Sequence, residues 1–98
     1  MIESEFQRKV KKEIKELFPA CYVLKADPTD IQGIPDLLIL CDDKWAALEV
    51  KKSKSASHRP NQDYHVDKMN NMSYAAFIYP ENKEEVYDAL KRTFGIGR

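Results

Sequence analysis

Two short motifs carry acidic side chains that could bind a metal ion and a lysine that could lie beside them. Gly33-Ile34-Pro35-Asp36 opens one apolar run, and Glu49-Val50-Lys51 closes the next, with twelve residues between Asp36 and Glu49. A short polar turn at 42–44 separates the runs, which predicts a β-hairpin. Side chains alternate along a strand, so Glu49 and Lys51 should point the same way. Pairing would bring Asp36 beside them, which predicts two carboxylates and an ammonium at one end of the hairpin.

The types of these side chains indicate which metal and which reaction to expect. Carboxylate oxygens suit Mg²⁺ or Mn²⁺, whereas zinc would favour His and Cys residues that this sequence does not group. Magnesium is usually held by one or two carboxylates together with substrate phosphate oxygens. Lys51 could orient an attacking water, help to deprotonate it, or balance charge on the phosphate. The set fits phosphodiester hydrolysis; the alternative is an exposed strand end with a surface ion pair.

A third carboxylate lies on the N-terminal helix. Apolar residues at spacings of four, four and three predict one buried stripe made of Phe6, Val10, Ile14 and Leu17. Glu3 falls on the same stripe. A carboxylate in that position is unfavourable unless it is paired or bound to a cation, which makes Glu3 a candidate metal ligand. The alternative is a frayed first turn, where the helix dipole also favours an acidic residue.

The remaining apolar runs predict a small α/β fold. Strands that alternate with helices imply a mixed four-stranded sheet flanked by helices, in the order α-β-β-β-α-β-α. Pro19 should end the first helix, and a capping-box-like start is expected for the last one, at Asn82 with Glu85. Strands are expected at 21–24, 36–41, 45–51 and 73–79, with a helix at 60–72. The inward positions expected on the last two helices are Tyr64, Met69, Met72, Val86, Leu90 and Phe94.

Composition limits the class of protein. The 98 residues, 43% hydrophobic and 33% charged, predict a single globular domain spanning 1–98. No apolar run is long enough to span a bilayer, and the N-terminus is too charged for a signal peptide, so we expect a cytoplasmic protein. Cys21 and Cys41 lie in apolar runs without a CxxC motif, and we interpret them as buried free thiols in a reducing cytosol. A single disulfide is the alternative.

Positive charge is concentrated in two clusters, one in the N-terminal helix and one directly after Glu49, although the formal net charge is zero. A surface polarised in this way can attract a polyanion such as DNA. The N-terminal cluster is equally well explained as a solvated helix face. The second cluster directly follows the carboxylate pair, and we expect it to contact DNA phosphates through Lys52, Lys54, His58 and Arg59.

Pro35-Asp36 with Glu49-Val50-Lys51 resembles the PD-(D/E)xK nuclease signature. More narrowly, the chain is similar to the small stand-alone viral form of the virus-type replication-repair nuclease (VRR-NUC) family. The similarity includes Gly33 before the first motif and Pro60-Asn61-Gln62 at the start of a helix. It also includes the N-terminal Glu3 and the start of the terminal helix, and therefore covers most of the chain.

The resemblance implies a restriction-endonuclease-like fold and a divalent-metal-dependent DNA endonuclease, structure-selective on branched DNA such as Holliday junctions. It implies the metal ligands Glu3, Asp36, Glu49 and the backbone carbonyl of Val50. Lys51 would be the catalytic lysine, and Gln62 a helix-borne residue at the site. Such a site needs no histidine, so His58 and His65 are interpreted as phosphate or solvent contacts rather than as general bases. Viral members act inside the host cell.

Two further questions are whether the chain assembles and whether it is an enzyme. We expect a homodimer, because a chain this short has a limited core, because two-fold dimers are the commonest assembly, and because the viral relatives work as dimers. Large residues that one small core could leave exposed are candidates for the interface: Trp45, Tyr64, Met72 and Tyr74. The alternative to an enzyme is a non-catalytic nucleic-acid-binding module that retains the nuclease fold.

Overall fold

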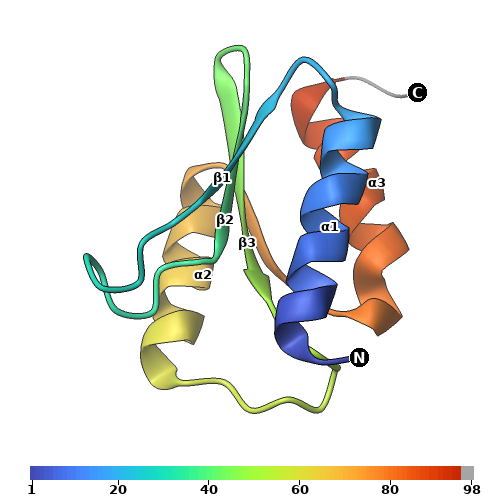
Figure 1. Ribbon diagram of the computed structural model, residues 1–98. Coiled ribbons are helices and arrows are strands. Elements are labelled where there is room, and N and C mark those ends of the chain that lie inside the picture. Colours follow the sequence, from blue (N-terminus) through green and yellow to red (C-terminus); the bar gives the residue numbers. More distant parts are fainter. Residues whose placement is uncertain (96–98) are drawn as a thin grey trace.

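A computed structural model describes residues 1–95 as three layers, with one mixed sheet between helices. Helices α1 and α3 cover one face of the sheet, and α2 covers part of the other (Figure 1). The observed order confirms the predicted α-β-β-β-α-β-α fold, with a single 3₁₀ turn before α3. The elements are α1 Glu3–Leu17, β1 Tyr22–Lys25, β2 Leu37–Cys41, β3 Lys44–Val50, α2 Pro60–Met72, β4 Tyr74–Ile78 and α3 Lys83–Phe94.

The strands lie in sequence order, and both kinds of strand pairing are present. β1, β2 and β3 are antiparallel neighbours, whereas β4 returns through the α2 crossover to lie parallel to β3. The tight turn between β2 and β3 contains Asp42, whose φ of 56° is left-handed, a region that Asp tolerates better than most residues. In this hairpin Leu37 pairs with Leu48, so the residue before β2 lies beside Glu49.

The main core lies between the sheet and the α1/α3 layer. Alternate residues of β3, among them Leu48 and Val50, are fully buried there. The opposite face carries a smaller cluster under α2, built on Ala47, Val66 and Ala75. Glu49 therefore points to the α2 side while its two neighbours anchor β3 in the main core.

Three details of the helices differ from the predicted pattern. Leu17 is 40% exposed, and Phe18 is buried in its place, because spacings of four continue the stripe through Ile14 to residue 18. On α2 the inward residue is Val66, with Met69 packed beside it. Tyr64 and Met72 are largely exposed, because neither lies three or four residues from Val66 along the helix.

The start of α3 also differs. The side chain of Asn82 does not cap this helix; it accepts a hydrogen bond from the Tyr79 N–H and donates one to the Phe77 carbonyl. The Asn82 amide, which the sequence pattern assigned to a capping box, therefore stabilises the turn between β4 and α3 instead. The predicted inward residues Val86, Leu90 and Phe94 are all buried.

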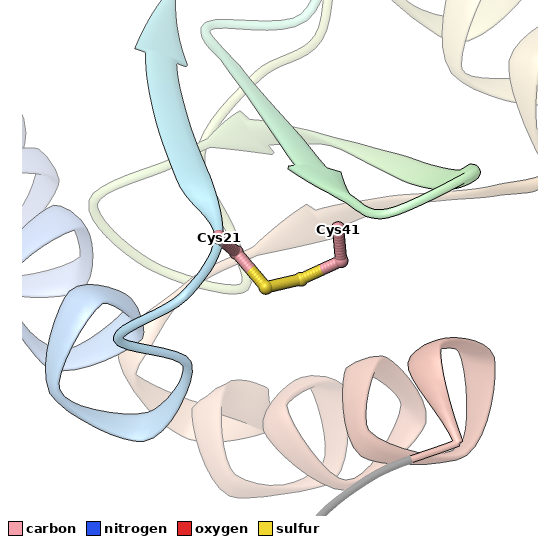
Figure 2. Close-up of a disulfide and its surroundings, with 2 residues drawn as sticks. All are labelled: Cys21 and Cys41. Carbon is pink, nitrogen blue, oxygen red and sulfur yellow. A yellow bond between two sulfur atoms is a disulfide. The ribbon is translucent and has the colours of Figure 1, made fainter.

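The prediction of free thiols is wrong. Cys21 and Cys41 form a disulfide with their Cα atoms 4.6 Å apart, at the start of β1 and the end of β2 (Figure 2). Antiparallel pairing of Tyr22 with Leu40 places the two cysteines next to each other, a register that the local sequence does not reveal. Across residues 1–95, no helix is long and apolar enough to cross a membrane.

Candidate active site

Asp36 is held at the mouth of the hairpin by the backbone of β3. Its Oδ2 accepts a hydrogen bond of 2.8 Å from the N–H of Val50. Its own carbonyl accepts another, of 2.9 Å, from the N–H of Ala26 at the end of β1. The carboxylate is thus fixed between two strands, directly beside Glu49.

Lys51 is buried, with 6% of its surface exposed, and its ammonium is held by two acceptors. Nζ donates to Oε1 of Gln62 at 2.8 Å and to the carbonyl of Ser57 at 3.1 Å. A buried ammonium needs such partners, because unsatisfied N–H groups away from water are strongly unfavourable. One acceptor comes from α2 and the other from the 51–59 connection, so both segments determine where the charge lies.

Gln62 links the acidic and basic halves of the site. Its Nε2 donates to Oε2 of Glu49 at 3.2 Å, while Oε1 accepts from Lys51. The same oxygen accepts a 3.0 Å hydrogen bond from the N–H of Arg59, the residue that precedes α2. Gln62 therefore satisfies an N–H group at the start of its own helix, as in half of a capping box, and this fixes the amide over the site.

The environment of Glu49 disfavours its charge. Burial is the largest effect, followed by the negative charge of Asp36 and a hydrogen bond with it, and together these raise the pKa of Glu49 to about 8. The charge of Lys51 opposes this shift, and Glu3 adds to it more weakly. Glu49 thus favours its protonated form at neutral pH, beside a second carboxylate in a position where a cation could bind.

One cavity of about 920 Å³ collects most of the residues predicted from the motifs. It is lined by Glu3 from α1, by Asp36 and Glu49 from the hairpin, and by Lys51 and Gln62. A second cavity, of about 590 Å³, lies on the loop side and shares the two hairpin carboxylates and Gln62. The carboxylate pair therefore borders open space on both sides.

The acidic side chains of the site offer oxygen ligands for a metal ion. Within residues 1–95, no three His, Cys, Asp or Glu side chains lie close enough together, as they stand, to form a preassembled site. Asp36 and Glu49 are in contact, and Glu3 is farther along the same cavity wall. Two carboxylates with an open side fit a hard ion such as Mg²⁺ or Mn²⁺, which takes further ligands from water and phosphate.

The residues expected to contact DNA do not all lie together. Lys52 and Arg59 line the larger cavity, but Lys54 does not, and its N–H donates to Glu81 instead. His58 stacks on Phe77 of β4 and does not line that cavity. The side chain of Val50 is fully buried on the opposite face of β3, and its carbonyl as a metal ligand stays a prediction.

Two cavity residues were missed by the sequence interpretation. Lys25 ends β1 and lies beside the start of β2, so its position depends on strand pairing. Gln7 also lines the cavity, and here a signal was present: it lies one helical turn after Glu3, on the same side of α1.

The comparisons with known proteins bear on the fold. A solved structure described as a VRR_NUC domain protein superposes with a TM-score of 0.71 at 18% sequence identity. The match covers 99% of this chain and 91% of that one. No protein-family model matches the sequence. No curated protein matches it either. At this identity the structural likeness shows a shared fold, and the activity has to be argued from the site.

Proposed function

We propose that this protein is a divalent-metal-dependent endonuclease that hydrolyses DNA phosphodiester bonds. The observation that carries the proposal is the arrangement of Asp36, Glu49, Lys51 and Gln62 on the wall of one cavity, joined by hydrogen bonds. The proposal is supported by the fold, which is shared with a VRR_NUC domain protein. A surface ion pair at a strand end would not be expected to bury both a carboxylate and an ammonium.

Asp36 and Glu49 would hold the metal, Mg²⁺ or Mn²⁺, with Glu3 and the Val50 carbonyl as further ligands. When bound, the ion would neutralise charge on the attacked phosphate and make a water molecule more acidic. Asp36 and Glu49 are held in contact, so their mutual repulsion favours the binding of a cation between them.

Lys51 would act as a fixed positive charge. Both of its partners are oxygen acceptors, and an ammonium that donates to both keeps one of its three N–H groups for substrate. A fixed ammonium beside the phosphate stabilises the negative charge that builds up in the transition state. Gln62 forms hydrogen bonds with both Lys51 and Glu49, and so fixes the position of the ammonium relative to the carboxylate.

The substrate backbone would run along the larger cavity, where Lys25, Lys52 and Arg59 supply positive charge. These contacts carry no sequence information, so the proposed selectivity is for DNA shape, with branched molecules such as Holliday junctions as the preferred substrates. Two such sites in a homodimer would cut two strands of one junction.

The test is cleavage of end-labelled DNA in Mn²⁺, with a four-way junction, a flap and a linear duplex as substrates. Lys51→Ala should reduce the cleavage rate by about a hundredfold or more, as expected when one stabiliser of transition-state charge is lost. Lys44→Ala is the matched control, because Lys44 is exposed at the opposite end of the same hairpin. Equal rates for wild type and Lys51→Ala would reject catalysis and favour a DNA-binding module.

A further inference from the structure

His58 is clamped between a strand and a helix. Its ring lies flat on the Phe77 ring of β4, with centroids 3.9 Å apart and planes at 16°. Its Nδ1 is 3.0 Å from Oδ1 of Asp63 in the first turn of α2. The sequence pattern placed His58 among the DNA contacts, but one face of its ring is covered and its Nδ1 has a protein partner.

The residues on either side of His58 contact the candidate site through their backbones. The carbonyl of Ser57 accepts a hydrogen bond from Lys51, and the N–H of Arg59 donates to Gln62. Both bonds depend on where the chain lies at residues 57–59. The side chain of His58, which lies between them, contacts both β4 and α2.

Besides these contacts, the middle of the connection between β3 and α2, residues 52–58, is held by few bonds. Residues 51–59 contain no helix or strand. Their other bonds include one from the Lys54 N–H to exposed Glu81, a turn bond from Ala56 to Ser53, and a contact between the Ser53 and Ser55 hydroxyls. At the two ends, the Lys51 N–H bonds to the Ile78 carbonyl, and the Arg59 carbonyl accepts from N–H groups in the first turn of α2. Exposed polar contacts contribute little to order, whereas stacked aromatic rings add stabilisation beyond the area that they bury.

We propose that His58 is a positioning residue: by stacking on Phe77 it holds the backbone of residues 57–59 where Ser57 can bind the Lys51 ammonium and Arg59 can fix Gln62. The effect of His58 on catalysis rests on the proposed nuclease function, whereas its effect on the positions of Lys51 and Gln62 does not. The ring stack is the stronger of the two anchors. The bond to Asp63 is partly exposed, with 58% of the aspartate side chain open to solvent, and contributes less.

The kinetic test uses the intact protein on the DNA substrate that wild type cleaves best. His58→Ala should lower kcat by about tenfold to a hundredfold, because small misplacements of catalytic groups have effects of that size, while KM stays within about twofold. His58→Phe keeps an aromatic ring on Phe77 and should recover most of the rate. Asp63→Asn should change kcat by less than about threefold, since its contact is screened by solvent.

Two other roles for His58 predict different results, and either result would overturn the proposal. If His58 contacts a phosphate, its loss should raise KM, leave kcat unchanged, and reduce the salt dependence of DNA binding by about one counterion. If it only stabilises the fold, His58→Ala should lower the melting temperature while kcat per folded molecule is unchanged. His58→Phe would then have no specific effect on the rate.

A spectroscopic test separates this proposal from the proposed function. In ¹⁵N-labelled protein, the Lys51 ammonium and the Gln62 amide should give slowly exchanging side-chain signals, because both are held by hydrogen bonds. His58→Ala should shift or broaden both signals, and His58→Phe should restore them. If wild type cleaves no DNA, the nuclease proposal fails while these signals still decide the position of Lys51. Signals unchanged in His58→Ala would refute the positioning role.

Discussion

Replacing Gly33 with alanine tests how the loop before β2 packs on the helix that carries Gln62. Gly33 has a φ of +81°, a left-handed conformation that L side chains rarely adopt. An added Cβ would lie 2.6 Å from Cγ and 2.9 Å from the backbone carbon of Asn61. Gly95, at the end of α3, offers a matched control: its φ is +70°, but an added Cβ would meet nothing within 4 Å.

The expected magnitudes follow from these two environments. A non-glycine residue in the left-handed region loses about 1–2 kcal/mol, and both alanine variants carry that penalty. At Gly33 the new methyl group also presses on the backbone of α2, which cannot turn aside as a flexible side chain would, and overpacking of this kind adds about 1–3 kcal/mol. Gly33→Ala should therefore lose about 2–5 kcal/mol in unfolding free energy, against about 1–2 kcal/mol for Gly95→Ala.

Denaturant unfolding measures both values, provided that the dependence on denaturant concentration is unchanged between variants. The Gly33 variant should also cleave DNA more slowly at temperatures where it is fully folded, because Asn61 precedes Gln62 on α2. Equal loss of stability in the two variants would refute the reasoning, since the loop would then not touch the helix as described.

Three further predictions concern stability. Reducing the disulfide, which joins cysteines 20 residues apart, should lower the unfolding free energy by about 3 kcal/mol, measured with and without dithiothreitol; an unchanged midpoint would contradict it. The pKa of Glu49 is raised to about 8, so the folded chain keeps a proton that the unfolded chain has released. Stability should therefore fall as pH rises from about 5 to 8, and less steeply in Glu49→Gln; parallel pH profiles would oppose this. The buried hydroxyl of Tyr87 donates to Glu13 at 2.8 Å, so Tyr87→Phe should lose about 1–3 kcal/mol in denaturant unfolding, whereas no loss would show that the bond is dispensable.

Local patterns were sufficient for the elements and for one long-range pairing. Two apolar runs around a short polar turn predicted the hairpin, and the observed register places Asp36 beside Glu49. Helical spacing predicted the buried faces of α1 and α3, including Phe6 and Leu90. These features depend on residues close in sequence, or on a turn whose length leaves little choice of register.

Most of the features that were missed depend on contacts between distant segments. The disulfide follows from the pairing of β1 with β2, and the place of Lys25 in the cavity follows from the same pairing. The contact of His58 with Phe77 joins a connection without regular structure to a strand 19 positions later, and no periodic pattern encodes it. Leu17 was misplaced because a spacing of three and a spacing of four both fit one helical face.

The nicking of closed circular DNA tests the central claim most directly, because a single cut in either strand converts supercoiled molecules to open circles. Wild-type protein should nick this DNA in Mn²⁺ or Mg²⁺ and stop when the metal is chelated. Asp36→Asn, which keeps an oxygen to accept the Val50 N–H bond but removes the charge, should be slower by about a hundredfold or more. Nicking at the same rate by Asp36→Asn and wild type, or no nicking by wild type with either metal, would contradict it.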